Sequence, residues 1–152
     1  SVPARAWSPA RCAKTVEALA ARGDRVVVTG GPDETDLTAS VASRHGLDLG
    51  GRTTFAEAAA VLAGAAAVVV GNTGPAHLAA AVGTPVVSLF APTVPLTRWA
   101  PYGVPVALLG DQDAPCRNSR ARVCPVPGHP CLDSVTPADV LAALDALVGV
   151  AA

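Results

Sequence analysis

The segment that most constrains this fold runs from Val68 to Leu78, with the sequence Val-Val-Val-Gly-Asn-Thr-Gly-Pro-Ala-His-Leu. A β-branched apolar stretch ends at a glycine, passes through Asn-Thr-Gly and continues into residues that favour a helix. Such a strand–turn–helix leaves unpaired backbone N–H groups at the carboxyl edge of a sheet, where the helix dipole adds roughly half a positive charge. The segment predicts either a phosphate-binding turn or an ordinary βα turn whose glycines only relieve backbone strain.

The rest of the chain repeats this alternation of short apolar strands and amphipathic helices. The expected helices are 11–21, 33–44, 54–63, 75–82 and one beginning at Thr136; the expected strands are 25–29, 47–49, 66–70, 86–90 and 104–109. Short β–α connections are typical of a parallel sheet with helices on both faces. We therefore expect one α/β, Rossmann-like three-layer domain over residues 1–152, with the turns 30–34, 71–74 and 91–93 along one edge of the sheet.

Several segments carry further local predictions. Asp33 is the expected N-cap of the second helix, and Thr54 with Glu57 forms a capping box before a helix whose apolar stripe begins at Phe55. The helix 75–82 is apolar nearly all round and should be buried on most sides. Residues 110–134 show no periodicity, which predicts a long irregular loop that is functional or mobile.

Composition and charge exclude several classes of protein. Of the 152 residues, 51% are hydrophobic but only 3% are aromatic, so the core should consist of Ala, Val and Leu. A net charge of −1 argues against a nucleic-acid-binding surface. No stretch reaches the roughly 18–20 uninterrupted apolar residues that span a bilayer. The abrupt start at Ser-Val-Pro-Ala-Arg leads us to expect a piece of a longer protein.

Several motifs, taken in order, give the chain a resemblance to a known family. They are Arg5-Ala-Trp7, Val26–Pro32, Gly51–Thr54, Gly71–His77, Leu89–Pro95 and Arg98–Pro101. Together they resemble the donor-binding half of the heptosyltransferases, glycosyltransferase family 9, which is the C-terminal Rossmann-like domain of a GT-B enzyme. Two positions depart from the family pattern: Asn72 stands where the family has an aspartate, and Arg5 where it has a lysine.

The resemblance implies transfer of a sugar, typically a heptose, from a nucleoside diphosphate sugar to a cell-surface saccharide. It implies an ADP-linked donor as substrate and no cofactor. It also implies that the N-terminal domain of the same enzyme binds the acceptor and supplies the catalytic base, so that this chain alone should be inactive. The expected location is the cytoplasm, with the inner face of the cell membrane as an option for the full-length enzyme.

The expected donor-binding residues lie mostly in the three turns. They are Arg5, Gly31, Glu34, Asp36, Asn72, Thr73, Gly74, His77 and Thr93. The N–H groups of Thr73 and Gly74 should face the diphosphate, because fixed dipoles stabilise the charge on the leaving group. A carboxylate of Glu34 or Asp36 could bind ribose hydroxyls, or could simply favour the first turn of a helix.

The 110–134 segment also contains the ligand types that zinc prefers, in Cys116, Cys124, His129 and Cys131. The spacing includes no Cys-x-x-Cys pair, and reduced cytoplasmic thiols argue against a disulfide. A plain cysteine-containing loop, a metal site and a disulfide stay open here. Two rival functions follow: a non-catalytic nucleotide- or phosphate-binding module, and a Cys/His metal-binding module on an α/β scaffold.

Overall fold

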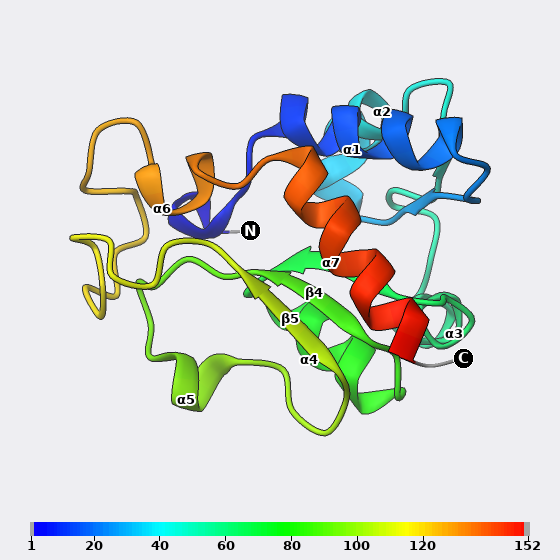
Figure 1. The fold of residues 1–152 in the computed structure, drawn as a ribbon. Helices are drawn as coiled ribbons and strands as arrows, with labels where there is room; N and C mark the ends of the chain where they lie inside the picture. The colour runs from blue at the N-terminus through cyan, green and yellow to red at the C-terminus, as the bar shows by residue number, and fades with distance from the viewer. Residues whose placement is uncertain (1, 151–152) are drawn as a thin grey trace.

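The computed structural model describes residues 2–150 of the chain (Figure 1). The helices within this range are α1 (Pro9–Ala21), α2 (Thr35–Ala42), α3 (Phe55–Ala63), α4 (Gly74–Ala81), α5 (Leu96–Trp99), α6 (Pro130–Asp133) and α7 (Pro137–Val150), with 3₁₀ turns η1 (Pro3–Arg5) and η2 (Pro32–Glu34). The strands are β1 (Val27–Val28), β2 (Leu47–Asp48), β3 (Val68–Gly71), β4 (Val86–Leu89) and β5 (Val106–Leu109). The predicted α/β class is confirmed.

The strands pair in parallel, as predicted, but they form two ladders within the described residues. One ladder has the order β3-β4-β5 and the other joins β1 to β2. In the larger ladder Gly71 pairs with Leu89, and Leu89 pairs with Leu109, so the carboxyl ends of all three strands are level. The turns after β3 and β4 therefore share one edge. The turn 30–34 follows β1 of the smaller ladder, so its place on the same edge stays a prediction.

The β3-β4-β5 sheet is the middle of three layers because β4 presents a different core on each face. Val87 and Leu89 belong to the larger core, together with Trp7 and with three residues of α7, Val140, Leu144 and Leu147. Val86 points the other way and packs with Leu62 of α3 and Ala79 of α4. Figure 1 shows α7 crossing one face of this sheet, with α4 on the other. Helices on both faces explain why every residue of β4 is buried.

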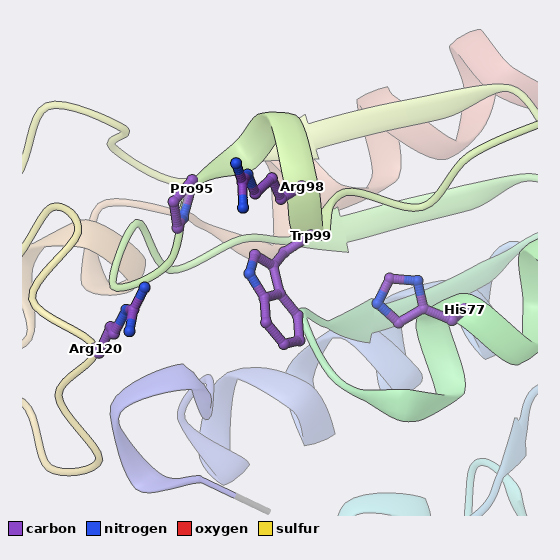
Figure 2. A pocket seen from close by; sticks show the side chains of 5 residues that line it. All are labelled: His77, Pro95, Arg98, Trp99 and Arg120. Atoms are coloured by element: carbon purple, nitrogen blue, oxygen red, sulfur yellow. The ribbon is translucent and has the colours of Figure 1, made fainter.

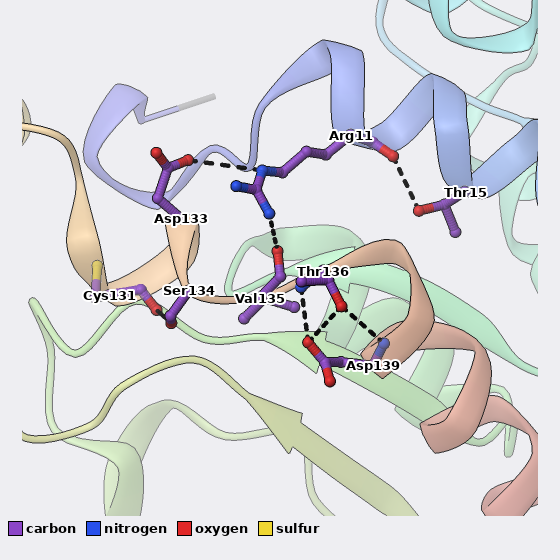
Figure 3. A network of polar contacts seen from close by, with 8 residues as sticks. All are labelled: Arg11, Thr15, Cys131, Asp133, Ser134, Val135, Thr136 and Asp139. Carbon is purple, nitrogen blue, oxygen red and sulfur yellow. Dashed lines mark hydrogen bonds and ion pairs between the residues drawn. The ribbon is translucent and has the colours of Figure 1, made fainter.

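Two capping boxes begin the helices that the sequence predicted. In α3 the Thr54 N–H donates to Glu57 Oε2 at 2.7 Å, and Glu57 N–H donates to Thr54 Oγ1 at 3.3 Å. In α7 Thr136 and Asp139 exchange the same two bonds (Figure 3). Figure 3 also shows Arg11 of α1 donating to the carbonyl of Val135, which fixes the start of α7 against α1.

Several local predictions are wrong, each for a physical reason. Asp33 lies inside η2, whose N-cap is Gly31, and the N-cap of α2 is Glu34. The Gly31 N–H donates to Glu34 Oε2. Phe55 begins α3 yet is 77% exposed, because it lies outside the buried part of that helix, which is at Leu62. In α4 burial is complete only at Ala76 and Ala79, since α4 covers the sheet from one side.

The 110–134 segment is less irregular than predicted, because it contains the short helix α6. Cys131 and Leu132 of this helix are buried in the larger core and hold the end of the segment on the protein. In the described part of the chain no helix combines the length and apolar character needed to cross a membrane.

Candidate functional site

The turn between β3 and α4 begins the candidate site. Thr73 is the N-cap of α4 in extended backbone, and its N–H donates to the Gly71 carbonyl at 2.8 Å. The prediction that this N–H faces a ligand is therefore wrong, since a bond within the turn already occupies it. Gly74 is the first helical residue, whose N–H has no carbonyl one turn earlier to bond. Gly74 is exposed, and a Cβ built on it would meet nothing within 4 Å, so the start of α4 is open to solvent.

Asn72 lies in the same turn, but its side chain points into the protein. The residue is only 4% exposed. Its Nδ2 donates to the Ala91 carbonyl at 3.1 Å, and its Oδ1 accepts the Ala91 N–H at 3.2 Å. Both the donor and the acceptor of the Asn72 amide, which was predicted to bind a ligand, are thus bonded to the backbone after β4.

Arg5 comes to the same turn from the N-terminal segment. A Cβ on Gly71 would stand 2.9 Å from the Arg5 carbonyl, so only a glycine lets this segment approach the end of β3 so closely. The Arg5 guanidinium lies 5.9 Å from the centre of the Trp99 ring, within cation–π range. Its Nε is buried and has no hydrogen-bond partner among the described residues.

A cavity of about 720 Å³ opens beside this turn, and Figure 2 shows the side chains around it. It is lined by His77, Pro95, Arg98, Trp99 and Arg120. His77 comes from α4, Arg98 and Trp99 come from α5, and Arg120 comes from the 110–134 segment. Among the described residues, neither Arg98 nor Arg120 has an ion-pair partner. The walls are therefore cationic and hydrogen-bonding, and no carboxylate in residues 2–150 lines them.

The other predicted residues lie elsewhere. Thr93 is fully buried, so its side chain does not reach the cavity surface, and its hydroxyl has no partner among the described residues. Gly31 donates its N–H to Glu34 Oε2 at 3.1 Å, which matches the ordinary helix-start interpretation for this carboxylate. Asp36 is exposed in the first turn of α2. Of the nine predicted residues, His77 lines the cavity, and Arg5 contacts Trp99 in its wall. The 72–74 turn leads into α4, the helix that carries His77.

The cysteine segment shows thiols packed into the core. Cys116 and Cys131 are buried, and burial raises the pKa of Cys131 to about 12, with smaller contributions from Cys116 and Cys124. The predicted fourth ligand turns away, since His129 Nε2 lies 3.1 Å from the Ala4 carbonyl. In residues 2–150 no group of three His, Cys, Asp or Glu side chains is arranged to hold a metal ion. The arrangement favours the plain cysteine-containing segment.

Four residues of the cavity wall, Pro95, Arg98, Trp99 and Arg120, were not among the predicted site residues. Arg98 and Trp99 stand in a Thr-Arg-Trp-Ala-Pro run, and a tryptophan in a chain with so few aromatic residues was the signal that could have identified them. Arg120 lies more than twenty residues further along. The backbone bond from the Arg120 N–H to the Thr93 carbonyl, 2.7 Å long, holds it beside the 91–93 segment.

Comparison with known proteins places this geometry in a family. The family model described as Glycosyltransferase family 9 (heptosyltransferase) matches residues 1–129. Lipopolysaccharide heptosyltransferase 3 of Escherichia coli is 34% identical over 153 residues, which cover 95% of this chain and 43% of the relative. This chain therefore spans less than half the length of that curated relative.

Solved structures agree on the fold. A glycosyltransferase family 9 protein of Veillonella parvula superposes with a TM-score of 0.83 at 21% identity, covering 97% of this chain and 43% of that chain. An E. coli heptosyltransferase, WaaC, solved with ADP-2-deoxy-2-fluoro heptose, superposes with a TM-score of 0.66 at 26% identity, covering 91% and 38%. With a family match over most of its length and a relative above 30% identity, the chain belongs to glycosyltransferase family 9, the heptosyltransferase family.

Proposed function

We propose that this chain is the donor-binding domain of a heptosyltransferase-like enzyme and that it binds a nucleoside diphosphate sugar, ADP-linked, at the start of α4. The enzyme transfers the sugar to a cell-surface saccharide. The observation that carries the proposal is the exposed start of α4 at Gly74, on the helix whose His77 lines a cavity with cationic walls.

The chemistry of the donor fits these walls. A diphosphate leaving group gains negative charge in the transition state, and a fixed N–H and nearby cations stabilise that charge. Gly74 supplies the N–H, and the α4 dipole adds to it. Arg5, Arg98 and Arg120 supply the positive charge, while His77 supplies a further hydrogen-bonding group at the cavity wall.

The nucleotide preference rests on the relatives. One similar structure was solved with an ADP-linked heptose analogue, and the curated relative is a lipopolysaccharide heptosyltransferase. We infer from them an ADP-linked donor for this chain, and a lipopolysaccharide or related cell-envelope glycan as the acceptor.

The chain spans 43% of that relative, so the remaining functions are assigned outside it. We propose that an N-terminal domain of the same enzyme binds the acceptor and supplies the catalytic base, and that this chain alone does not turn over. We also propose a cytoplasmic location, with the full-length enzyme acting at the inner face of the membrane.

The test is a calorimetric titration of this chain with ADP, UDP and GDP, repeated on two variants of Gly74. Gly74→Pro removes the N–H at a first helical position, where proline is well tolerated. Gly74→Ala keeps the N–H and places its Cβ in open space. Loss of one hydrogen bond to a charged phosphate should weaken ADP binding by about tenfold to a hundredfold in Gly74→Pro.

Two outcomes would contradict the proposal. Equal ADP affinity in Gly74→Pro and Gly74→Ala would show that the N–H does not hold the phosphate. Saturable ADP binding with no sugar transfer by an enzyme that contains both domains would instead favour the non-catalytic nucleotide-binding module.

A further inference from the structure

Asn72 joins two loops through both ends of one amide. Beyond the last ladder pair, Gly71 with Leu89, the Asn72 side chain continues the pairing of β3 with β4 by donating to and accepting from Ala91. An aspartate here could accept the Ala91 N–H, but its second oxygen would face the Ala91 carbonyl without a proton to share. The site thus requires a short side chain that both donates and accepts, which is asparagine.

The contacts continue from Ala91 to the far wall of the cavity. The next two carbonyls, those of Pro92 and Thr93, accept the N–H groups of Asn118 and Arg120, both at 2.7 Å. Asn118 and Arg120 have φ values of 58° and 57°, a left-handed conformation that non-glycine residues adopt only when their surroundings hold them. The 91–93 segment is therefore the support on which Arg120 is placed.

Asn72 stands between the two halves of the candidate site. Along the chain it is two residues from Gly74 and five from His77, which lines one side of the cavity. Through Ala91 and the 92–93 carbonyls it is connected to Arg120, which lines the other side. Because the amide is buried and has both ends bonded, it is not available to a ligand.

We propose that Asn72 is a positioning residue: the Asn72–Ala91 clamp sets where Arg120 stands relative to the start of α4, and so controls affinity for an anionic ligand without touching it. The ligand in this inference rests on the proposed function, but the clamp can be tested without a ligand. Loss of the clamp frees the 91–93 segment, and the Asn118 and Arg120 amides lose their fixed acceptors.

The first experiment is residue-resolved hydrogen exchange of this chain and of Asn72→Asp and Asn72→Ala. Asn72→Asp keeps the volume and the acceptor but loses the donor, whereas Asn72→Ala loses both. We expect exchange at the Asn118 and Arg120 amides to accelerate at least about tenfold in both variants, the effect of losing one buried hydrogen bond. Thr84→Val is the matched control, because it removes another buried bond, from Oγ1 to the Leu62 carbonyl at 2.8 Å, at the opposite end of β4.

The second experiment measures ADP affinity in a double-variant cycle. Asn72→Ala and Arg120→Ala should each weaken binding, and the double variant should bind about as well as Arg120→Ala alone. If Asn72→Ala weakened binding only by destabilising the fold, Thr84→Val would weaken binding equally. The effect of Asn72→Ala would then add to that of Arg120→Ala in the double variant. Such additivity, or unchanged exchange at Asn118 and Arg120 in both Asn72 variants, overturns the inference. Failure of the unsubstituted chain to bind ADP would overturn the proposed function, and the exchange data would still decide the clamp.

Discussion

Replacing Gly110 with alanine should strongly destabilise this chain. Gly110 follows β5 with a φ of +121°, a conformation open almost only to glycine. A Cβ there would stand 2.7 Å from the Phe90 carbonyl oxygen and 3.1 Å from that of Cys131. Both oxygens are held in place, since they accept hydrogen bonds from Gln112 Nε2 and from the Asp111 N–H.

The magnitude follows from these two costs. Backbone strain of this kind costs about 1–3 kcal/mol. Moving two anchored carbonyls to relieve the contacts is a form of overpacking, which costs about another 1–3 kcal/mol. Together they predict that Gly110→Ala lowers the free energy of unfolding by about 4 kcal/mol, a large share of the about 5–15 kcal/mol typical of a domain.

Urea unfolding followed by circular dichroism gives the free energies, with Gly128→Ala as the control. Gly128 also has a positive φ, +79°, but a Cβ there would meet nothing within 4 Å. Its substitution should cost only the backbone strain, about 1–2 kcal/mol. A difference between the two variants of less than about 1 kcal/mol would show that the close contacts at Gly110 contribute nothing, and would refute the reasoning.

Three further changes test other parts of the structure. Gly71→Ala places a Cβ 2.9 Å from the Arg5 carbonyl, so it should push Arg5 from the Trp99 ring and weaken ADP binding by about tenfold, measured by calorimetry. Burial raises the pKa of Cys131 to about 12, whereas an unfolded thiol has a pKa of about 8.5. The contribution of this thiol to stability is therefore complete below the unfolded pKa and is lost as the pH rises towards 12. Between about pH 7.5 and 10.5 the urea midpoint should fall less steeply in Cys131→Ala than in the unsubstituted chain. The pKa of Glu57 is lowered by the bonds from the Thr54 N–H and hydroxyl, so the stabilisation from this carboxylate is present at neutral pH and is lost progressively in acid. Glu57→Ala should therefore be less stable than the unsubstituted chain at pH 7, and the difference in urea midpoint should shrink as the pH falls below 4.5.

Local patterns in the sequence predicted the elements well. Thr54 and Glu57 behave as predicted because each is the other's partner one turn away. The order of strands and helices follows from the same local signals. These signals also led to the 71–74 turn.

The predictions for individual site residues failed where the residue's partner is distant in sequence. Asn72 is a polar residue in a turn where ligands commonly bind, but its hydrogen-bond partner, Ala91, is nineteen residues away. The sequence therefore could not show that its side-chain amide is already bonded. Thr93 follows a buried strand on the expected edge, yet the backbone bond to Arg120 holds it inside. Arg120 reaches the cavity through that same bond. Periodicity carries no information on contacts of this kind.

The arrangement of the strands in two ladders has a consequence for the chain in solution. Within residues 2–150, β3 pairs only with β4, and β1 pairs only with β2, so each presents a row of unbonded backbone groups on its other side. The valines of β3 are half-buried where those of β4 are fully buried. Open, β-branched strand edges are templates for pairing with another chain. Self-association through these edges should therefore rise with protein concentration.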